Sequence, residues 1–316
     1  MIFTELYQGQ GLGNQLFVYV ATRALAKKLG QPFGIKHPER FKAPRLFDID
    51  FGEQVPDDIE YVQHNEYWHG QHAPINDNLK YLVMTDKSVF NYTNQQNVKL
   101  EGGWQSEGYF HEDLENIPEW LKVKEEYDHN DTNDDNLCVI NVRGGECRNS
   151  HVFPPRSYWD DAIQKMVEFN PNMKFVVVTD DPDGAKQVLP EFECYHRDIE
   201  TERQNPQDSF VGYWDYVALK NCQHIICCAT TFACFPLYTN KNLKKCIAPK
   251  YSFCAFHSDG YWCRGSSIFS YVTEYMDTSG NLFTPEQCWK EWKEYYTSRN
   301  IFTQEELDNI YEWGNV

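Results

Sequence analysis

Short, mostly apolar segments alternate with amphipathic segments from residue 137 onward, and this alternation constrains the fold more than any other feature. The apolar segments are too short for ordinary helices and present no polar face, so we expect them to be strands. Strands of this kind are typical of parallel sheets covered by helices, which bind ligands at the carboxyl ends of the strands. The predicted strands are 137–142, 174–181, 192–195, 224–229 and 245–249, and the predicted helices are 158–168, 184–189, 208–221 and one that opens at Thr230.

The first 125 residues carry a smaller set of the same signals. We expect a strand at 2–7, a helix with one apolar face at 14–29 and a second strand at 31–37. The polar, acidic segment 124–136 is expected to be an exposed linker. The predicted fold class is therefore α/β, with two α/β domains that face a cleft. The predicted units are an N-terminal domain at 1–125, a ligand-binding domain at 137–270 and C-terminal helices at 271–316, opened by capping boxes at Thr284 and Thr303.

The charge and hydropathy of the chain exclude two classes of partner. The net charge is −18, whereas a nucleic-acid-binding protein normally presents a basic face. No apolar run is long enough to span a membrane, and the N-terminus has no signal-peptide pattern. We therefore expect a soluble, cytoplasmic protein with no nucleic-acid partner and no stable membrane insertion.

The cysteines and histidines suggest thiols rather than a metal centre. The chain has 11 cysteines without any C-x-x-C pair, which favours buried, reduced thiols. Cys254, His257 and Cys263 have the spacing of three zinc ligands but lack a clear fourth. We therefore expect no metal, and a zinc protein is the most distant alternative.

The glycine-rich stretch "GQGLGNQLF" at 9–17 follows the first predicted strand and invites a dinucleotide-binding interpretation. That interpretation needs G-x-G-x-x-G and an acidic residue at the end of the second strand. Here Asn14 takes the place of the third glycine, and the second strand ends in Lys36 and His37. The stretch therefore predicts a tight strand-to-helix turn rather than a site for NAD or FAD.

Two later stretches place polar residues at the carboxyl ends of strands. Arg143 follows the strand at 137–142 and precedes two glycines, so its forked donors are well placed to bind a diphosphate. Thr230 and Thr231 follow the strand at 224–229, where hydroxyl and amide donors at a helix start either cap the helix or bind an anion. Each stretch also has an ordinary structural explanation, as a surface charge or a helix cap.

Taken together, these stretches resemble the glycosyltransferase family that contains the α-1,2-fucosyltransferases. The family's G-G-L-G-N-Q-(L/M)-F motif is similar to residues 9–17, and its W-Q-S-E-x-Y-F motif to "GGWQSEGYF" at 102–110. Its H-x-R-R-G-D motif corresponds to "NVRGGE" at 141–146, and a strand ending in S-D-D to "TDD" at 179–181. Its N-S-S-F-S-W-W segment corresponds more loosely to "ATTFACF" at 229–235, which "IAPK" at 247–250 follows.

The resemblance implies a GT-B-like fold and an inverting, metal-independent transferase that moves fucose from GDP-fucose to a hydroxyl of a glycan acceptor. The donor would be a substrate, and no other cofactor is implied. The first domain would then hold the acceptor and the second the GDP-sugar. Catalytic roles fall to Arg143 (on the β-phosphate), Glu146 (as the general base, with His151 as the other candidate) and Asn14. Donor-binding roles fall to Gly11, Gln15, Asn141, Asp215, Thr230, Thr231 and Phe232.

The chain departs from the family's pattern at positions that bear on the donor. Asn141 replaces histidine, Gly144 replaces the second arginine, and Glu146 replaces aspartate. An arginine that stabilises the charge of a transition state is worth several kcal/mol. Two alternatives therefore stay open: a related transferase that uses a different nucleotide sugar, and a non-catalytic protein of the same fold that binds a glycan or nucleotide.

Overall fold

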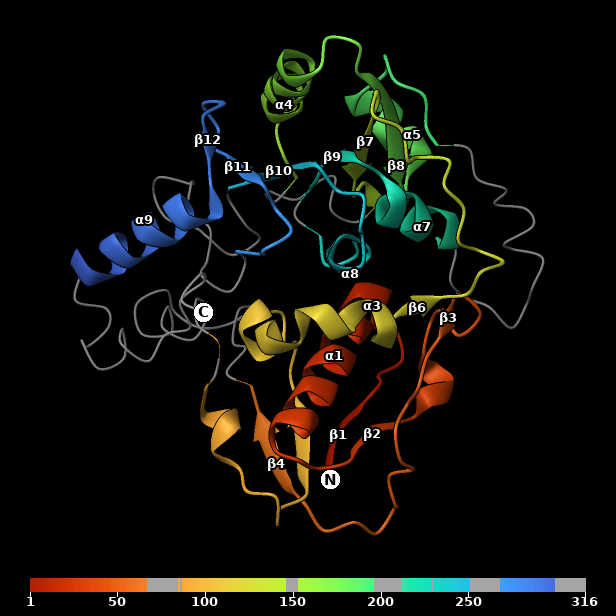
Figure 1. The fold of residues 1–316 in the computed structure, drawn as a ribbon, viewed down its shortest axis with the longest axis vertical. Helices are drawn as coiled ribbons and strands as arrows, with labels where there is room; N and C mark the ends of the chain where they lie inside the picture. Colours follow the sequence, from red (N-terminus) through yellow and green to blue (C-terminus); the bar gives the residue numbers. More distant parts are fainter. Residues whose placement is uncertain are drawn as a thin grey trace.

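Two sheets, one from each half of the chain, form the frame of the molecule (Figure 1). The computed structural model describes residues 1–66, 85, 87–145, 153–195, 212–228, 230–250 and 268–298. The first sheet has the order β2-β1-β5-β4 and is parallel throughout. The second has the order β12-β11-β10-β9-β7-β8 and is parallel except for the β11–β12 pair. Their strands are β1 (Ile2–Glu5), β2 (Phe33–Lys36), β4 (Val62–Asn65), β5 (Val98–Glu101), β7 (Leu137–Val142), β8 (Lys174–Thr179), β9 (His224–Ile226), β10 (Lys245–Pro249), β11 (Glu274–Met276) and β12 (Leu282–Phe283).

Helices and short elements surround these sheets. A small antiparallel pair joins β3 (Phe47–Asp48) to β6 (Lys122–Val123). The α-helices are α1 (Leu12–Lys28), α3 (Ile117–Trp120), α4 (Arg156–Phe169), α5 (Pro182–Val188), α7 (Tyr213–Asn221), α8 (Cys234–Tyr238) and α9 (Pro285–Ser298). The 3-10 helices are η1 (Pro38–Arg40), η2 (Lys87–Asn91), η3 (Glu107–Tyr109) and η4 (His111–Asn116). Within the described ranges, no helix is long and apolar enough to cross a membrane.

The predicted α/β class with parallel sheets is confirmed, and so are most of the predicted elements. Two expectations were wrong. The predicted strand at 192–195 contributes only a single bridge between Val177 and Cys194. The helix expected to open at Thr230 begins instead at Cys234, because Thr230 and the three residues after it form a turn. The boundaries at 1–125, 137–270 and 271–316 stay a prediction, although β11 and β12 join the second sheet.

The capping box at Thr284 is confirmed at the start of α9. The backbone N–H of Thr284 donates to Gln287 Oε1 at 2.7 Å, and the N–H of Gln287 donates to Thr284 Oγ1 at 3.3 Å. The two residues thereby satisfy backbone donors that a helix start otherwise leaves unpaired. Thr303 lies outside the described residues.

The segment 124–136, expected to be an exposed linker, is bound to α7. The buried hydroxyl of Thr132 donates to the carbonyl of Ala218 at 2.7 Å. Asp128 accepts from Lys220 at 2.9 Å and from Asn221 at 3.0 Å. Most of the segment is exposed, as expected, and Thr132 is its one buried residue. Its composition does not reveal that Thr132 and Asp128 bond to α7.

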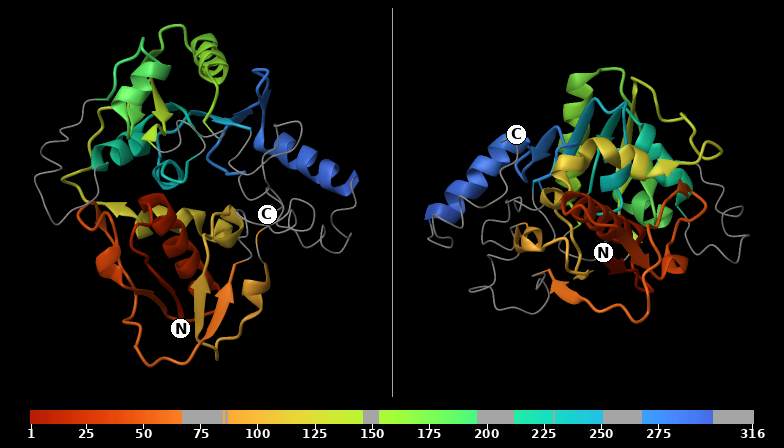
Figure 2. Two further views of the ribbon diagram at one scale, coloured as in Figure 1. Left: turned by 180° about the vertical axis from the view of Figure 1, so that it is seen from behind. Right: turned by 60° about the horizontal axis from the view of Figure 1, so that its bottom comes forward.

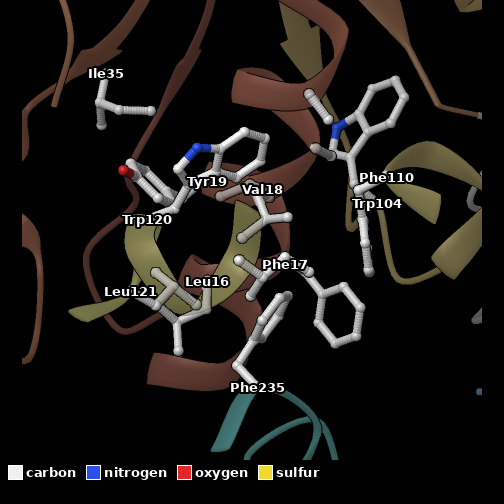
Figure 3. Close-up of a cluster of buried hydrophobic side chains, with 14 of the residues drawn as sticks. Leu16, Phe17, Val18, Tyr19, Ile35, Trp104, Phe110, Trp120, Leu121 and Phe235 are labelled. Atoms are coloured by element: carbon white, nitrogen blue, oxygen red, sulfur yellow. The ribbon is translucent and has the colours of Figure 1, made fainter. Parts of the chain in front are cut away.

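One apolar core is shared between the two halves. Helix α1 lies between the sheets, and both the front view and the view from behind place its first turns beneath α8 (Figures 1 and 2). Phe235 of α8 points at Phe17 of α1, with their rings edge to face and their centroids 4.8 Å apart (Figure 3). Tyr216 of α7 meets Phe47 of β3 in the same way at 5.0 Å. The halves are therefore joined by buried apolar surface as well as by the linker.

The eight described cysteines are free thiols, as expected. Burial raises the pKa values of several of them, Cys138 and Cys222 among them, which keeps these thiols protonated. Cys254, His257 and Cys263 lie outside the described residues. Among those that the structure describes, no cluster of three histidine, cysteine or carboxylate side chains could hold a metal ion.

Candidate functional site

The carboxyl ends of the two sheets' strands face each other where α1 begins. The loop after β1 leads into α1, and the segment after β9 leads through 230–233 into α8. A Cβ at Gly13 would lie 2.5 Å from both the carbonyl carbon and the carbonyl oxygen of Thr231. Backbone therefore packs directly on backbone at this point, and only glycine fits. The glycine stretch joins the halves here, while Gly11, with nothing within 4 Å of an added Cβ, serves as the N-cap residue of α1.

Asn14 links both halves through one oxygen. Its Oδ1 accepts hydrogen bonds from Thr231 Oγ1 at 2.9 Å and from Gln105 Nε2 at 3.1 Å. The side chain is partly exposed, and its Nδ2 group makes no hydrogen bond to the described residues. Asn14 therefore positions the two segments and still has amide donors for a ligand.

The structure gives Gln15 a different place from the one predicted. Its side chain is fully buried, its Nε2 donates to the carbonyl of Arg40 at 2.9 Å, and its Oε1 accepts from the N–H of Lys42 at 2.9 Å. Both ends of the amide are thus used to hold the segment after η1. We do not retain Gln15 as a donor-binding residue.

Arg143 lies just past the end of β7 and forms an ion pair with Asp180. Its Nη1 is 2.7 Å from Asp180 Oδ2, and about a third of each side chain is exposed. The other oxygen, Asp180 Oδ1, accepts from the N–H of Gly144 at 3.0 Å. The backbone N–H of Arg143 lies 3.2 Å from Cys228 Sγ, which brings the arginine next to the segment that follows β9.

Gly144 cannot carry a side chain in this arrangement. A Cβ there would lie 2.6 Å from the Cβ of Asp181, and Gly145, with φ +29°, is similarly close to Asp180 Oδ2. Asp181 in turn accepts from the N–H of Gly184 at 2.9 Å as the N-cap of α5. The missing second arginine is thus tied to the close packing of this loop on the end of β8.

Thr230, Thr231 and Phe232 form a tight turn rather than the start of a helix. The N–H of Phe232 donates to Thr230 Oγ1 at 3.2 Å, and the Phe232 ring packs edge to face on Tyr216 with the centroids 6.2 Å apart. The hydroxyl of Thr231 donates a hydrogen bond to Asn14 Oδ1. Thr230 Oγ1 is the acceptor in its bond with Phe232, so its hydroxyl proton can still be donated to a ligand.

Two other predicted site residues, Asn141 and Asp215, are buried. Asn141 is buried at the end of β7, and its Oδ1 lies 3.5 Å from Cys228 Sγ. Asp215 is buried in the first turn of α7. Burial and the negative charges of Asp131 and, to a smaller extent, Asp215 raise the pKa of Tyr195. Glu146 and His151 lie outside the described residues.

Three residues of this region were not among the expected site residues. Gln105 and Glu107 belong to the stretch 102–110, and Asp180 to the stretch 179–181. The carboxyl-end rule for parallel strands could have pointed to Asp180, because that residue directly follows β8. Gln105 and Glu107 gave no such signal, since their partners Asn14 and Tyr238 lie 91 and 131 residues away along the chain.

The arrangement suits an anionic ligand. One permanent cation, one hydroxyl donor and one amide donor come from three segments that meet at the facing strand ends. Charge-assisted bonds from an arginine are about twice as strong as neutral ones. Asp180 opposes this attraction, so an anion must share Arg143 with Asp180 or displace it.

The sequence matches no family model and no curated protein. Solved structures that align with it include the fucosyltransferase NodZ from Bradyrhizobium, at 14% identity over 77% of this chain and 94% of that one, with a TM-score of 0.44. NodZ alpha-1,6-fucosyltransferase co-crystallized with GDP aligns at 14% identity over 78% of this chain and 94% of that one, with a TM-score of 0.45. A mutant of Arabidopsis thaliana FUT1 in complex with GDP aligns at 10% identity over 86% of this chain and 72% of that one, with a TM-score of 0.44. TM-scores below 0.5 do not establish a common fold.

Proposed function

We propose that this protein is an inverting, metal-independent glycosyltransferase that moves fucose from GDP-fucose to a hydroxyl of a glycan acceptor. In this proposal the two halves form a GT-B-like arrangement, with the acceptor on the side of residues 1–125 and the donor on the side of residues 137–270. The motif resemblance supplies the chemistry. The geometry of the described residues supports it at one place, the junction of α1 with the turn at 230–232.

The observation that carries the proposal is the contact between this turn and the first turn of α1. Gly13 packs on the backbone of Thr231, Asn14 bonds to the Thr231 hydroxyl, and Arg143 lies beside Cys228, two residues before Thr230. Three motifs that are distant in sequence thus meet at the carboxyl ends of strands from both sheets. This is the usual location of ligands in open α/β sheets.

Arg143 has the central role in the proposed reaction. As the glycosidic bond to the diphosphate breaks, negative charge grows on the β-phosphate oxygens. A guanidinium held beside those oxygens stabilises this charge without the help of a metal ion. Thr230 and the amide of Asn14 are the other donors that we assign to the diphosphate and the transferred sugar. The acceptor proton needs a base within hydrogen-bond reach, for which Glu146 stays the proposed residue.

Calorimetric titration with GDP tests the proposal directly. We expect Arg143→Ala to weaken GDP binding about 10- to 100-fold, since a hydrogen bond to a charged group contributes about 1.5–3 kcal/mol. The matched control is Arg156→Ala, which removes an arginine that also pairs with carboxylates, Asp160 and Glu191, at the start of α4. Equal GDP affinity of the two variants would overturn the assignment of Arg143. Release of GDP from GDP-fucose in the presence of a glycan acceptor then tests the transfer.

A second candidate is a related transferase with a different nucleotide sugar, which the packing of Gly144 on Asp181 favours. With one arginine in place of two, and with that arginine paired to Asp180, the site is less cationic than the family's motif implies. A panel of GDP-, UDP- and dTDP-sugars separates the two candidates by which nucleotide is released. Saturable binding without release of any nucleotide would instead support the non-catalytic alternative.

A further inference from the structure

An exposed aromatic ring stands at the start of the glycine stretch and belongs to no role assigned so far. Tyr7 is 41% exposed, and its hydroxyl donates to both carboxylate oxygens of Glu101, at 2.6 and 2.7 Å. The backbone N–H of Gln10 donates to the carbonyl of Tyr7 at 3.3 Å, which closes the turn behind the ring. A large ring that is exposed yet fixed at its tip and at its backbone is preorganised for contact.

A cluster of charged side chains lies beside the hydroxyl tip of this ring. Lys99 lies 3.1 Å from both Glu5 and Glu101, while Arg40 and His37 approach Glu5 at 3.4 and 3.5 Å. Glu39 adds a third carboxylate, 3.0 Å from His37 and 4.0 Å from Arg40. Three carboxylates thus face two permanent cations, Lys99 and Arg40, so the cluster gives an anionic ligand no net attraction. It does offer fixed hydrogen-bond donors and acceptors, which suit a neutral molecule with many hydroxyl groups.

The ionisation states of the cluster are well defined. Burial and the hydrogen bond to Glu101 raise the pKa of Tyr7 to about 12, so the phenol stays protonated and donates. For Glu5, burial acts to raise the pKa, but the bond to Lys99 and the nearby positive charges outweigh it and lower the value. The cluster therefore keeps its charges near neutral pH.

The ring lies close to the proposed donor site. Tyr7 and Asn14 both bond to the short segment 101–105. Tyr7 donates to Glu101, and Asn14 accepts from Gln105. Four residues of fully extended chain span at most about 14 Å. A ligand that reached Asn14 with one sugar ring would therefore meet Tyr7 with another ring of the same short oligosaccharide.

We propose that Tyr7, held by Glu101, forms a subsite for a neutral oligosaccharide acceptor, with the sugar ring stacked on the tyrosine and its hydroxyls bonded to the Glu5, Lys99 and Glu101 cluster. This inference rests on the proposed function, because it takes Asn14 as the place of the reacting sugar. It adds that the acceptor is neutral and longer than one sugar.

The test uses saturation-transfer-difference NMR with four defined probes, namely galactose, lactose, the neutral tetrasaccharide lacto-N-tetraose and the acidic 3′-sialyllactose. We expect the wild-type protein to bind lacto-N-tetraose more tightly than galactose. Tyr7→Ala is expected to lower the affinity for the tetrasaccharide at least tenfold and to leave the GDP affinity within twofold. Tyr7→Phe keeps the ring but loses the bond to Glu101. We therefore expect its affinity for the tetrasaccharide to lie between those of the wild-type protein and Tyr7→Ala.

Tyr61→Ala is the matched control, because Tyr61 is a 48% exposed tyrosine of the same half that packs on Phe3 instead. Equal tetrasaccharide binding by the Tyr7→Ala and Tyr61→Ala variants would overturn the subsite, as would tighter binding of 3′-sialyllactose or no binding of any neutral probe. If the wild-type protein binds the tetrasaccharide through Tyr7 but does not bind GDP, the proposed function fails and the glycan site stands. If it binds GDP through Arg143 but ignores the neutral probes, the subsite alone fails.

Discussion

Two glycines at the proposed site are explained by the close approach of other residues rather than by a bound phosphate. Gly13 faces the backbone of Thr231, and Gly144 faces the side chain of Asp181. A positive φ often explains why a turn contains glycine. Gly9 and Gly145 have a positive φ, but Gly13 and Gly144 do not. A side chain at either position would push apart two segments whose contact builds the site.

Gly13→Ala tests this at the residue scale. The added methyl group would meet the Thr231 carbonyl at 2.5 Å, and that atom belongs to a backbone that cannot swing aside. We expect the variant to lose about 1–3 kcal/mol of unfolding free energy, as overpacked sites do, and to bind GDP more weakly. Urea unfolding followed by circular dichroism measures the first effect. Gly103→Ala is the control, because an added Cβ there would come no closer than 3.5 Å to another group. A loss as large as that of Gly13→Ala would refute the explanation.

At the scale of elements, two helix starts expected at threonines have different local structures. Thr284 and Gln287 form the predicted capping box at the start of α9, where the side chain of each bonds to the backbone N–H of the other. Thr230 and Thr231 carry a similar signal, yet one bonds within its own turn and the other bonds to Asn14. Local sequence predicts a cap when the partners are three residues apart. It has no means to predict a partner 217 residues away.

The capping box makes a prediction for α9. Thr284→Ala removes the side-chain acceptor for the Gln287 N–H, and we expect a loss of about 1 kcal/mol of unfolding free energy. Thr278→Ala, in the turn before β12, is the control and is expected to change the stability by less than about 0.5 kcal/mol. Chemical denaturation measures the unfolding free energy of both variants. Equal values would show that the cap does not stabilise the protein.

At the scale of the whole molecule, the two halves share buried contacts that composition does not disclose. Phe17 and Phe235 meet in the shared core. The carboxylate of Glu107, 1% exposed, accepts from the Tyr238 hydroxyl at 2.6 Å and from the Ser270 N–H at 2.7 Å across the same boundary. The strands and helices of each half could be predicted from their apolar patterns. The faces through which the halves contact each other could not be predicted, because their residues would be apolar whether they packed within one half or between the two halves.

The shared core predicts that the halves unfold together. Phe235→Ala is expected to cost about 3–5 kcal/mol, the range for truncating a buried phenylalanine, and to shift a single transition rather than split it. Hydrogen exchange read separately in β1 and β7 provides one probe for each half. Phe169→Ala, which truncates a phenylalanine that is 55% exposed, is the control. Separate transitions in the wild-type protein would show that the halves are independent.

We propose above that Arg143, the turn at Thr230 and the first turn of α1 form one site for the diphosphate of a nucleotide sugar. A crystal structure of the protein with GDP tests this. We expect Arg143 to lie within about 3 Å of a β-phosphate oxygen and to share or leave Asp180, and we expect Thr230 and Asn14 to border the same phosphate. A GDP molecule bound elsewhere, with the Arg143–Asp180 pair unchanged, would contradict it.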